Sequence, residues 1–238
     1  MLPFEILLLV ANSGALAINH NAHNLGHQDF LADSGRTPEP IHTYQCFEGD
    51  IASYPAPTHW LSLLDLWNIN REQILSSNAG NTYLQYYIQQ AIIKVAKESN
   101  IDARLVLALV MGESRGKASS PCVGGNVPRC GILHALKGSL LDESQSSESV
   151  ERMIREGIIG SPEGGLGYAQ LVEGKPRLAN VAPGCLFTAA RAYHLGNLRQ
   201  NAEQVEQDRH DVEDARFVND LANRLLGWDG RGEGFSQC

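Results

Sequence analysis

Residues 102–116 read Asp-Ala-Arg-Leu-Val-Leu-Ala-Leu-Val-Met-Gly-Glu-Ser-Arg-Gly, and this stretch decides the expected fold. The carboxylate of Asp102 can accept hydrogen bonds from the free N–H groups of a first helical turn, so Asp102 suits an N-cap. Seven apolar residues then follow without a break, from Leu105 to Met111. Because a surface helix carries polar residues at every turn, we expect this helix to be buried on nearly all sides. It is too short to cross a bilayer.

Glu113 stands directly after the apolar run, and Gly116 suits the end of the helix. Burial and the negative end of the helix dipole both disfavour a charged carboxylate, so we expect the pKa of Glu113 to be raised. A carboxylic acid that stays protonated near neutral pH is a suitable general acid. Glu113 is therefore the candidate catalytic residue, weighed against the common case of a solvated glutamate at a helix end.

Composition indicates an ordinary globular protein with one good-sized core, since the 238 residues are 43% hydrophobic and 19% charged. The net charge of -8 makes nucleic acid a poor partner, because binding to phosphates depends on basic residues. An acidic protein also gains nothing from general attraction to anionic cell walls. Any carbohydrate would be held by hydrogen bonds and ring stacking. We expect the protein to be a monomer.

The N-terminus resembles an export signal. Residues 6–10 form an apolar core, and Ala15-Leu16-Ala17 is a small-x-small cleavage site, although no basic residue precedes the core. We therefore expect a signal peptide at 1–17 and a secreted, extracellular protein without a membrane anchor after signal removal. Residues 18–43 follow as a polar, poorly ordered leader. The leader contains four histidines, but nothing rigid fixes ligand geometry there, so we expect no metal and no other cofactor.

Five cysteines fit an oxidising compartment. The tight Gly- and Pro-containing loop between Cys122 and Cys130 favours a disulfide between them. A second disulfide between Cys46 and Cys238 would tie the two ends of the domain together and leave Cys185 as a buried thiol in its helix. No Cys-x-x-Cys pattern is present, so structural zinc is not expected.

Hydrophobic periodicity predicts a mainly helical single domain. Besides the central stretch, helices are expected at 59–67, 82–99, 148–157 after a capping Ser147, 183–195 with Pro183 in its first turn, and 211–226. Residues 115–146 are rich in Gly, Ser and Pro and are expected to form a long loop region over the end of the helix that bears Glu113. The glycine-rich stretch 160–172 lacks the spacing of a phosphate-binding loop.

Three separated motifs resemble one family in the same order. They are Glu113-Ser114 at the end of a buried helix, Gly131-Ile-Leu-His134, and Ala192-Tyr-His-Leu-Gly196. Soluble lytic transglycosylases and goose-type lysozymes have Glu-Ser, Gly-Leu-Met-Gln and Ala-Tyr-Asn-x-Gly. The chain is most similar to secreted fungal proteins with this lysozyme-like domain, which share Tyr-Gln-Cys at 44–46, Met-Ile-Arg-Glu-Gly at 153–157 and Ala-Asn-Arg-Leu-Leu-Gly-Trp at 222–228. The resemblance covers residues 44–228 and leaves 229–238 as a C-terminal tail.

The resemblance implies a lysozyme-like fold that cleaves β-1,4 links between N-acetylated amino sugars, in peptidoglycan or in chitin. Glu113 would be the catalytic acid and then the base. The residues that would bind substrate are Ser114, His134, Tyr193 and Gln170. From periodicity alone, Tyr193 is equally well explained as a core aromatic, and Gln170 as a surface loop residue.

The chain departs from the family where His134 replaces glutamine, His194 replaces asparagine and Leu136 replaces an acidic residue. Most glycosidases need two carboxylates, and no motif distinguishes a second one among Asp142, Glu143 and Glu163. A single acid suffices if the 2-acetamido group of the substrate stabilises the positive C1. Attack by the sugar's own 6-hydroxyl would then give a 1,6-anhydro product, and attack by water would give hydrolysis. The alternatives are a non-catalytic secreted binder of chitin or peptidoglycan fragments, and a purely structural secreted domain.

Overall fold

A computed structural model describes residues 43–48, 53–124, 127–174, 186–196 and 210–238. The expected signal peptide at 1–17, the leader from 18 to 42 and Cys185 lie outside the described residues. Within the described ranges, every helix is too short or too polar to span a bilayer.

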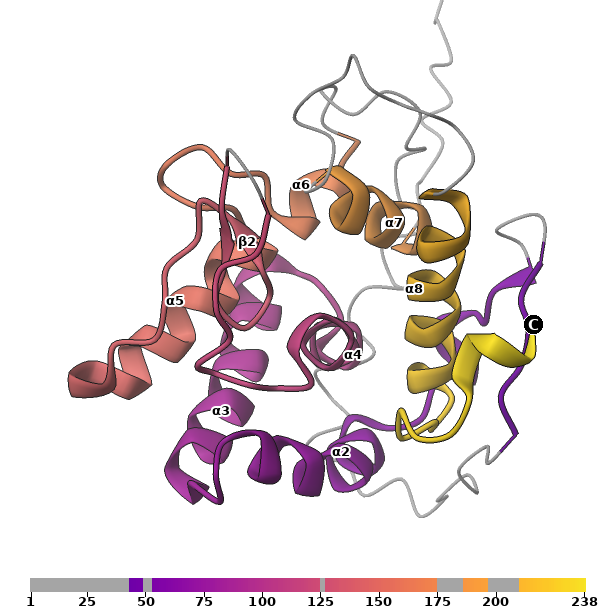
Figure 1. Ribbon diagram of the computed structural model, residues 1–238, viewed down its shortest axis with the longest axis horizontal. Coiled ribbons are helices and arrows are strands. Elements are labelled where there is room, and N and C mark those ends of the chain that lie inside the picture. The colour runs from indigo at the N-terminus through magenta and orange to yellow at the C-terminus, as the bar shows by residue number, and fades with distance from the viewer. Residues whose placement is uncertain (1–42, 49–52, 125–126, 175–185, 197–209) are drawn as a thin grey trace, which may run out of the picture.

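The protein is mainly helical, as predicted (Figure 1). Its α-helices are α2 (Leu63–Ser77), α3 (Thr82–Ser99), α4 (Ala103–Ser114), α5 (Ser146–Ile158), α6 (Tyr168–Val172), α7 (Leu186–Gly196) and α8 (His210–Leu225). Short 3-10 turns lie at Pro57–His59, Glu143–Gln145 and Gly234–Gln237. Two two-residue strands, β1 (Arg129–Cys130) and β2 (Ala135–Leu136), pair antiparallel in the loop region between α4 and α5.

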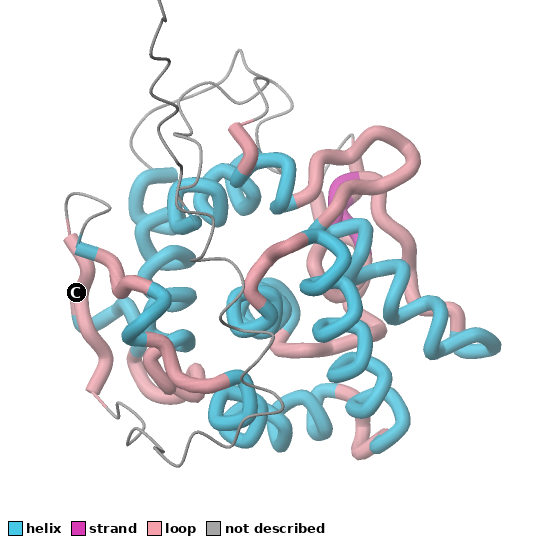
Figure 2. The backbone as a smooth tube through the Cα atoms, turned by 180° about the vertical axis from the view of Figure 1, so that it is seen from behind, coloured by secondary structure: helices cyan, strands magenta, loops and turns pink. Residues whose placement is uncertain are grey.

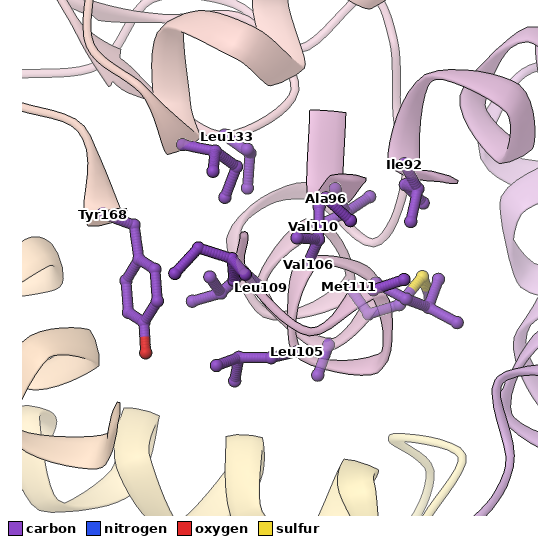
Figure 3. Close-up of a cluster of buried hydrophobic side chains, with 14 of the residues drawn as sticks. Ile92, Ala96, Leu105, Val106, Leu109, Val110, Met111, Leu133 and Tyr168 are labelled. Carbon is purple, nitrogen blue, oxygen red and sulfur yellow. The ribbon is translucent and has the colours of Figure 1, made fainter. Parts of the chain in front are cut away.

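Helix α4 occupies the centre of the molecule, where Figures 1 and 2 show it nearly end-on with the other helices around it. All nine of its residues from Ala103 to Met111 are buried, which confirms the prediction from the apolar run. Side chains from α3, α6 and the loop after β1 pack against it, among them Ile92, Tyr168 and Leu133 (Figure 3). The N-cap is also as predicted, because Asp102 Oδ1 accepts a hydrogen bond from the backbone N of Arg104 at 2.9 Å.

The first predicted helix, 59–67, has wrong bounds. Helix α2 begins at Leu63, where the Ser62 hydroxyl accepts a hydrogen bond from the backbone N of Asp65 at 3.1 Å and caps the first turn. The apolar residues before Ser62 are buried for another reason, since the backbone N of Leu61 donates to the carbonyl of Leu225 at 3.0 Å and draws this segment against α8. The helix continues to Ser77 because apolar positions such as Ile74 keep one face in the core.

The other helices agree with the prediction more closely. Helix α3 has the predicted bounds, whereas α5 begins two residues early, so that Ser147 lies inside it and not at its cap. Helix α7 begins at Leu186, and Pro183 lies outside the described residues. Helix α6 was not predicted. It is five residues long, and the Gln170 side chain holds its start by accepting a hydrogen bond from the backbone N of Gly167 at 3.0 Å.

Both predicted disulfides are present, Cys122–Cys130 and Cys46–Cys238. The second joins residues 192 apart in sequence and fastens the C-terminal segment to the extended segment 44–47. That extended segment runs along α8, where the backbone N of Gln45 donates to Asn223 Oδ1 at 2.8 Å and the Tyr44 hydroxyl donates to Asp220 Oδ1 at 2.6 Å. Residues 229–238 are therefore bonded to the helical body and do not form a free tail.

Candidate active site

Glu113 lies on the last turn of α4, and its side chain is only 1% exposed. Its two carboxylate oxygens face different groups. Oε2 lies 3.2 Å from His134 Nδ1 and 3.5 Å from the Arg129 guanidinium, and Oε1 lies 3.3 Å from His194 Nδ1. We call these four residues the Glu113 cluster. It joins α4, the β1–β2 hairpin and α7, three segments that are far apart in the sequence.

The β1–β2 hairpin delivers Arg129 and His134. Its turn closes with a hydrogen bond from the backbone N of His134 to the carbonyl of Gly131 at 3.0 Å, and His134 has a left-handed φ of 45°. The Cys122–Cys130 disulfide anchors the strand that carries Arg129. Nε2 of His134 lies 2.9 Å from the Ser120 hydroxyl, so both ring nitrogens of His134 have partners. The predicted position of this loop over the end of α4 is thus confirmed.

His194 reaches Glu113 from α7, and its ring stacks on an aromatic ring of α8. Its imidazole stacks on Phe217 with ring centroids 4.1 Å apart and planes 6° apart. Phe217 in turn lies over Gly112, where an added Cβ would come within 3.1 Å of the ring. Glycine before the candidate glutamate therefore lets Phe217 approach α4 and support His194. Within the described part of the chain, Nε2 of His194 makes no hydrogen bond, and the side chain is 25% exposed.

The prediction that the pKa of Glu113 is raised is wrong. Burial does raise it, as expected. The hydrogen bonds from His134 and His194, together with the charges of His194 and Arg129, outweigh that effect and lower the pKa to about 2. The low dielectric and the helix dipole follow from the sequence of α4 itself, whereas the loop and α7 bring the cationic and donor groups to the carboxylate only in the folded protein. Glu113 is therefore ionised at neutral pH.

The other predicted site residues lie around the cluster without joining it. The Ser114 hydroxyl donates to the carbonyl of Val110 at 3.3 Å. Tyr193 is 1% exposed and its hydroxyl donates to the carbonyl of Leu133 at 2.9 Å, which is the core position that periodicity also allowed. Gln170 caps α6.

The three candidates for a second catalytic carboxylate also lie outside the Glu113 cluster. Asp142 accepts hydrogen bonds from Ser144 and precedes the 3-10 turn that includes Glu143. Glu163 is exposed, and its carbonyl accepts from Lys137 Nζ at 3.0 Å. Leu136, where goose-type lysozymes have an acidic residue, is buried in β2. Within the described residues, Glu113 therefore contributes the single carboxylate of the Glu113 cluster.

Sequence reasoning missed Arg129 and Ser120 as members of the site and treated His194 only as a departure from a family motif. Arg129 and Ser120 belong to no motif, because their contacts depend on how the loop folds over α4. His194 did carry a signal. It stands one residue after Tyr193 in a segment already matched to the family, and imidazole can hydrogen-bond where asparagine would.

A pocket of about 390 Å³ opens beside the cluster, between the end of α4, α8 and the segment 228–234. His194, Gly112 and Phe217 line it, so His194 separates the buried Glu113 carboxylate from this space. Within the described residues, no group of three or more His, Cys, Asp or Glu side chains is arranged to hold a metal ion.

The fold and the site together define a mainly helical, disulfide-bonded protein with a buried carboxylate–histidine cluster next to a pocket. No family model, curated protein or solved structure matches this chain.

Proposed function

We propose that the protein cleaves β-1,4-linked N-acetylated amino-sugar polymers, with peptidoglycan as the substrate, in the manner of a lytic transglycosylase or lysozyme and outside the cell. The observation that carries the proposal is the Glu113 carboxylate, which ends a buried helix and contacts a histidine that lines a pocket. The ordered resemblance of Glu113-Ser114, Gly131–His134 and Tyr193 to the lytic transglycosylases supports it.

The lowered pKa of Glu113 changes which group can donate the proton to the bridging oxygen of the substrate. An ionised carboxylate cannot donate a proton, so the donor to the bridging oxygen must be another group. His194 is placed for this role, because Nδ1 faces Glu113 at 3.3 Å and Nε2 lies on the other side of the ring. Imidazole is the side chain that gains and loses a proton near neutral pH. Glu113 would orient the ring and stabilise its positive charge, as a carboxylate does for a catalytic histidine.

In the proposed reaction, Nε2 of protonated His194 donates to the bridging oxygen while the C1–oxygen bond breaks. The 2-acetamido oxygen of the substrate stabilises the positive C1, as in substrate-assisted glycosidases, where this group takes the place of a carboxylate nucleophile. Neutral His194 then accepts a proton from the attacking hydroxyl. The buried Leu136 offers no group that could hold a water molecule, which favours the sugar's own 6-hydroxyl as the attacking group and a 1,6-anhydro end as the product.

The test is digestion of two polymers, purified peptidoglycan and chitin oligomers, with detection of new chain ends by mass spectrometry. We expect new chain ends from peptidoglycan. Intact chains from both polymers after prolonged incubation over the range pH 4 to 8 would contradict it.

A second function, the binding of sugar fragments without cleavage, is favoured by one specific observation. The Glu113 side chain is 1% exposed and its pKa is lowered to about 2, whereas a general acid needs contact with substrate and a proton to give. A protein that binds chitin or peptidoglycan fragments would keep the pocket and need no accessible acid. Measurable binding of these fragments, together with no new chain ends, would support this function.

A further inference from the structure

The pocket beside His194 carries an unusual set of charges for this acidic chain. Three arginines line it, together with two carboxylates, whereas the whole chain has a net charge of -8. The charged residues are Arg115 at the end of α4, Arg216, Asp220 and Arg224 on α8, and Glu233. We call this space the arginine pocket.

Arg224 is a buried cation without a carboxylate partner. The residue is 6% exposed, and no carboxylate of the described residues lies within ion-pair distance of it. One guanidinium nitrogen donates to Asn70 Oδ1 at 3.3 Å, and the guanidinium carbon lies 5.2 Å from the centroid of the Trp228 ring. Nε has no hydrogen-bond partner within the described residues. A buried charge without an ion-pair partner is costly. Removal of water from the guanidinium lowers the pKa of Arg224 to about 10, although the charge of nearby Asp220 acts in the opposite direction.

The segment 228–234 closes over this guanidinium. A Cβ added at Gly230 would fall on the terminal nitrogens of Arg224, and the backbone φ of +83° at this position also favours glycine. The chain therefore encloses a positive charge at the wall of a pocket, and within the described residues no carboxylate lies close enough to form an ion pair with it.

The two carboxylates that line the pocket do not cancel its arginines. Asp220 accepts a hydrogen bond from the Tyr44 hydroxyl at 2.6 Å and lies 3.9 Å from Arg216 Nε, and its charge also raises the pKa of Arg224 without forming an ion pair with it. Arg115, the C-cap of α4, is exposed and adds a further positive charge near Arg224. Three arginines against two carboxylates leave the pocket with an excess of positive charge.

We infer that the arginine pocket binds a carboxylate of an acidic amino-sugar ligand, next to the group that His194 contacts. The inference rests on the proposed function and names the chemical feature by which its substrate would be recognised. Arginine suits this role because its planar fork can donate two parallel hydrogen bonds to a carboxylate. Peptidoglycan carries carboxylates on its peptides and on those lactyl groups that bear no peptide, whereas chitin carries none, so the pocket would distinguish the two polymers.

The test compares binding of three small ligands to the full chain by calorimetry: N-acetylmuramic acid, its methyl ester and N-acetylglucosamine. We expect the acid to bind about tenfold or more tightly than the ester, because charge-assisted hydrogen bonds are about twice as strong as neutral ones. The preference should weaken as salt rises. Equal binding of acid and ester, or no binding of the acid at millimolar concentration, would overturn the inference.

Amino-acid substitutions in the arginine pocket test whether the acid binds there. Because Arg224 is buried, its replacement risks unfolding, so the double variant Arg115→Gln/Arg216→Gln is used, and Arg71→Gln on α2 is the matched control. We expect the double variant to lose about tenfold of its affinity for the acid and the control to lose none. Unchanged affinity of a folded double variant would overturn the inference.

If cleavage of peptidoglycan persists while the acid and the ester bind equally, the inference fails and the proposed function stands. If the acid binds but nothing is cleaved, the proposed function fails instead.

Discussion

Nδ1 of His194 lies 3.3 Å from Oε1 of Glu113, the carboxylate oxygen that His134 and Arg129 leave free. The two histidines thus contact one carboxylate in different ways. His134 is held on both sides, by Glu113 and by Ser120, whereas His194 is 25% exposed and lines a pocket. Their replacement should therefore have different consequences.

We expect His194→Asn to lower cleavage by about 100-fold or more, the usual contribution of a proton donor to the rate. Asparagine can keep a hydrogen bond to Glu113 but cannot deliver a proton. Wild-type turnover by a folded His194→Asn variant would assign the proton donor elsewhere.

The matched variant is His134→Gln, which introduces the residue that the lytic transglycosylases have at this place. Glutamine can donate an amide hydrogen to Glu113, and the side chain does not face the pocket. We therefore expect turnover to remain within about tenfold of wild type. A loss as large as that of His194→Asn would show that the two histidines are not distinguished in the way we propose.

Acid stability should report the charge of Glu113. The folded-state pKa of about 2 lies below the ordinary value of 4.5, so ionised Glu113 stabilises the folded protein above about pH 4.5, and this contribution disappears as the pH falls toward 2. The difference corresponds to about 3 kcal/mol in the free energy of unfolding. Urea unfolding between pH 2 and 6 measures it.

The control for that experiment is Glu163→Gln, at an exposed loop position, which should keep the pH dependence of the wild type. Glu113→Gln should flatten the fall in stability between pH 4.5 and 2. If the two variants show the same slope, the Glu113 carboxylate is not held in its charged form by the cluster.

The two disulfides should contribute unequally to stability. Cys46–Cys238 closes a loop of 192 residues and Cys122–Cys130 a loop of 8. On the chain-entropy relation these correspond to about 5 and about 3 kcal/mol. Replacing both cysteines of one pair by alanine, followed by thermal unfolding, should therefore lower the melting temperature more for the Cys46–Cys238 pair. The reverse order would mean that anchoring of the β1–β2 hairpin matters more than loop length.

The sequence predicted the central helix well because its signal is local. An N-cap at Asp102, an unbroken apolar run and a glycine at position 116 are all adjacent in the chain, and burial follows from the run itself. Bounds set by distant contacts were not predictable in the same way. Helix α2 begins where Ser62 caps it and where the preceding segment bonds to Leu225, a residue more than 160 positions away.

The candidate site shows the same division between local and distant causes. Glu113 could be singled out from its own helix, and His134 and His194 from short motifs. The direction in which the pKa of Glu113 shifts could not be predicted from the sequence. It depends on Arg129 and on two imidazoles that reach the carboxylate only when the loop and α7 fold against α4. The arginine pocket likewise joins the ends of α4 and α8 to the C-terminal segment, and no sequence pattern links these.

The central claim is that this protein cleaves a glycan chain through Glu113. The most direct measurement is mass spectrometry of peptidoglycan incubated in ¹⁸O-labelled water with the wild type, with Glu113→Gln and with the control Glu163→Gln. We expect new, unlabelled 1,6-anhydro ends from the wild type and the control, and about 100-fold or more fewer from Glu113→Gln, because the uncharged amide cannot stabilise the positive charge of His194. Labelled reducing ends would mean hydrolysis in place of 6-hydroxyl attack. No new ends from the wild type, or equal numbers from a folded Glu113→Gln variant, would contradict the claim.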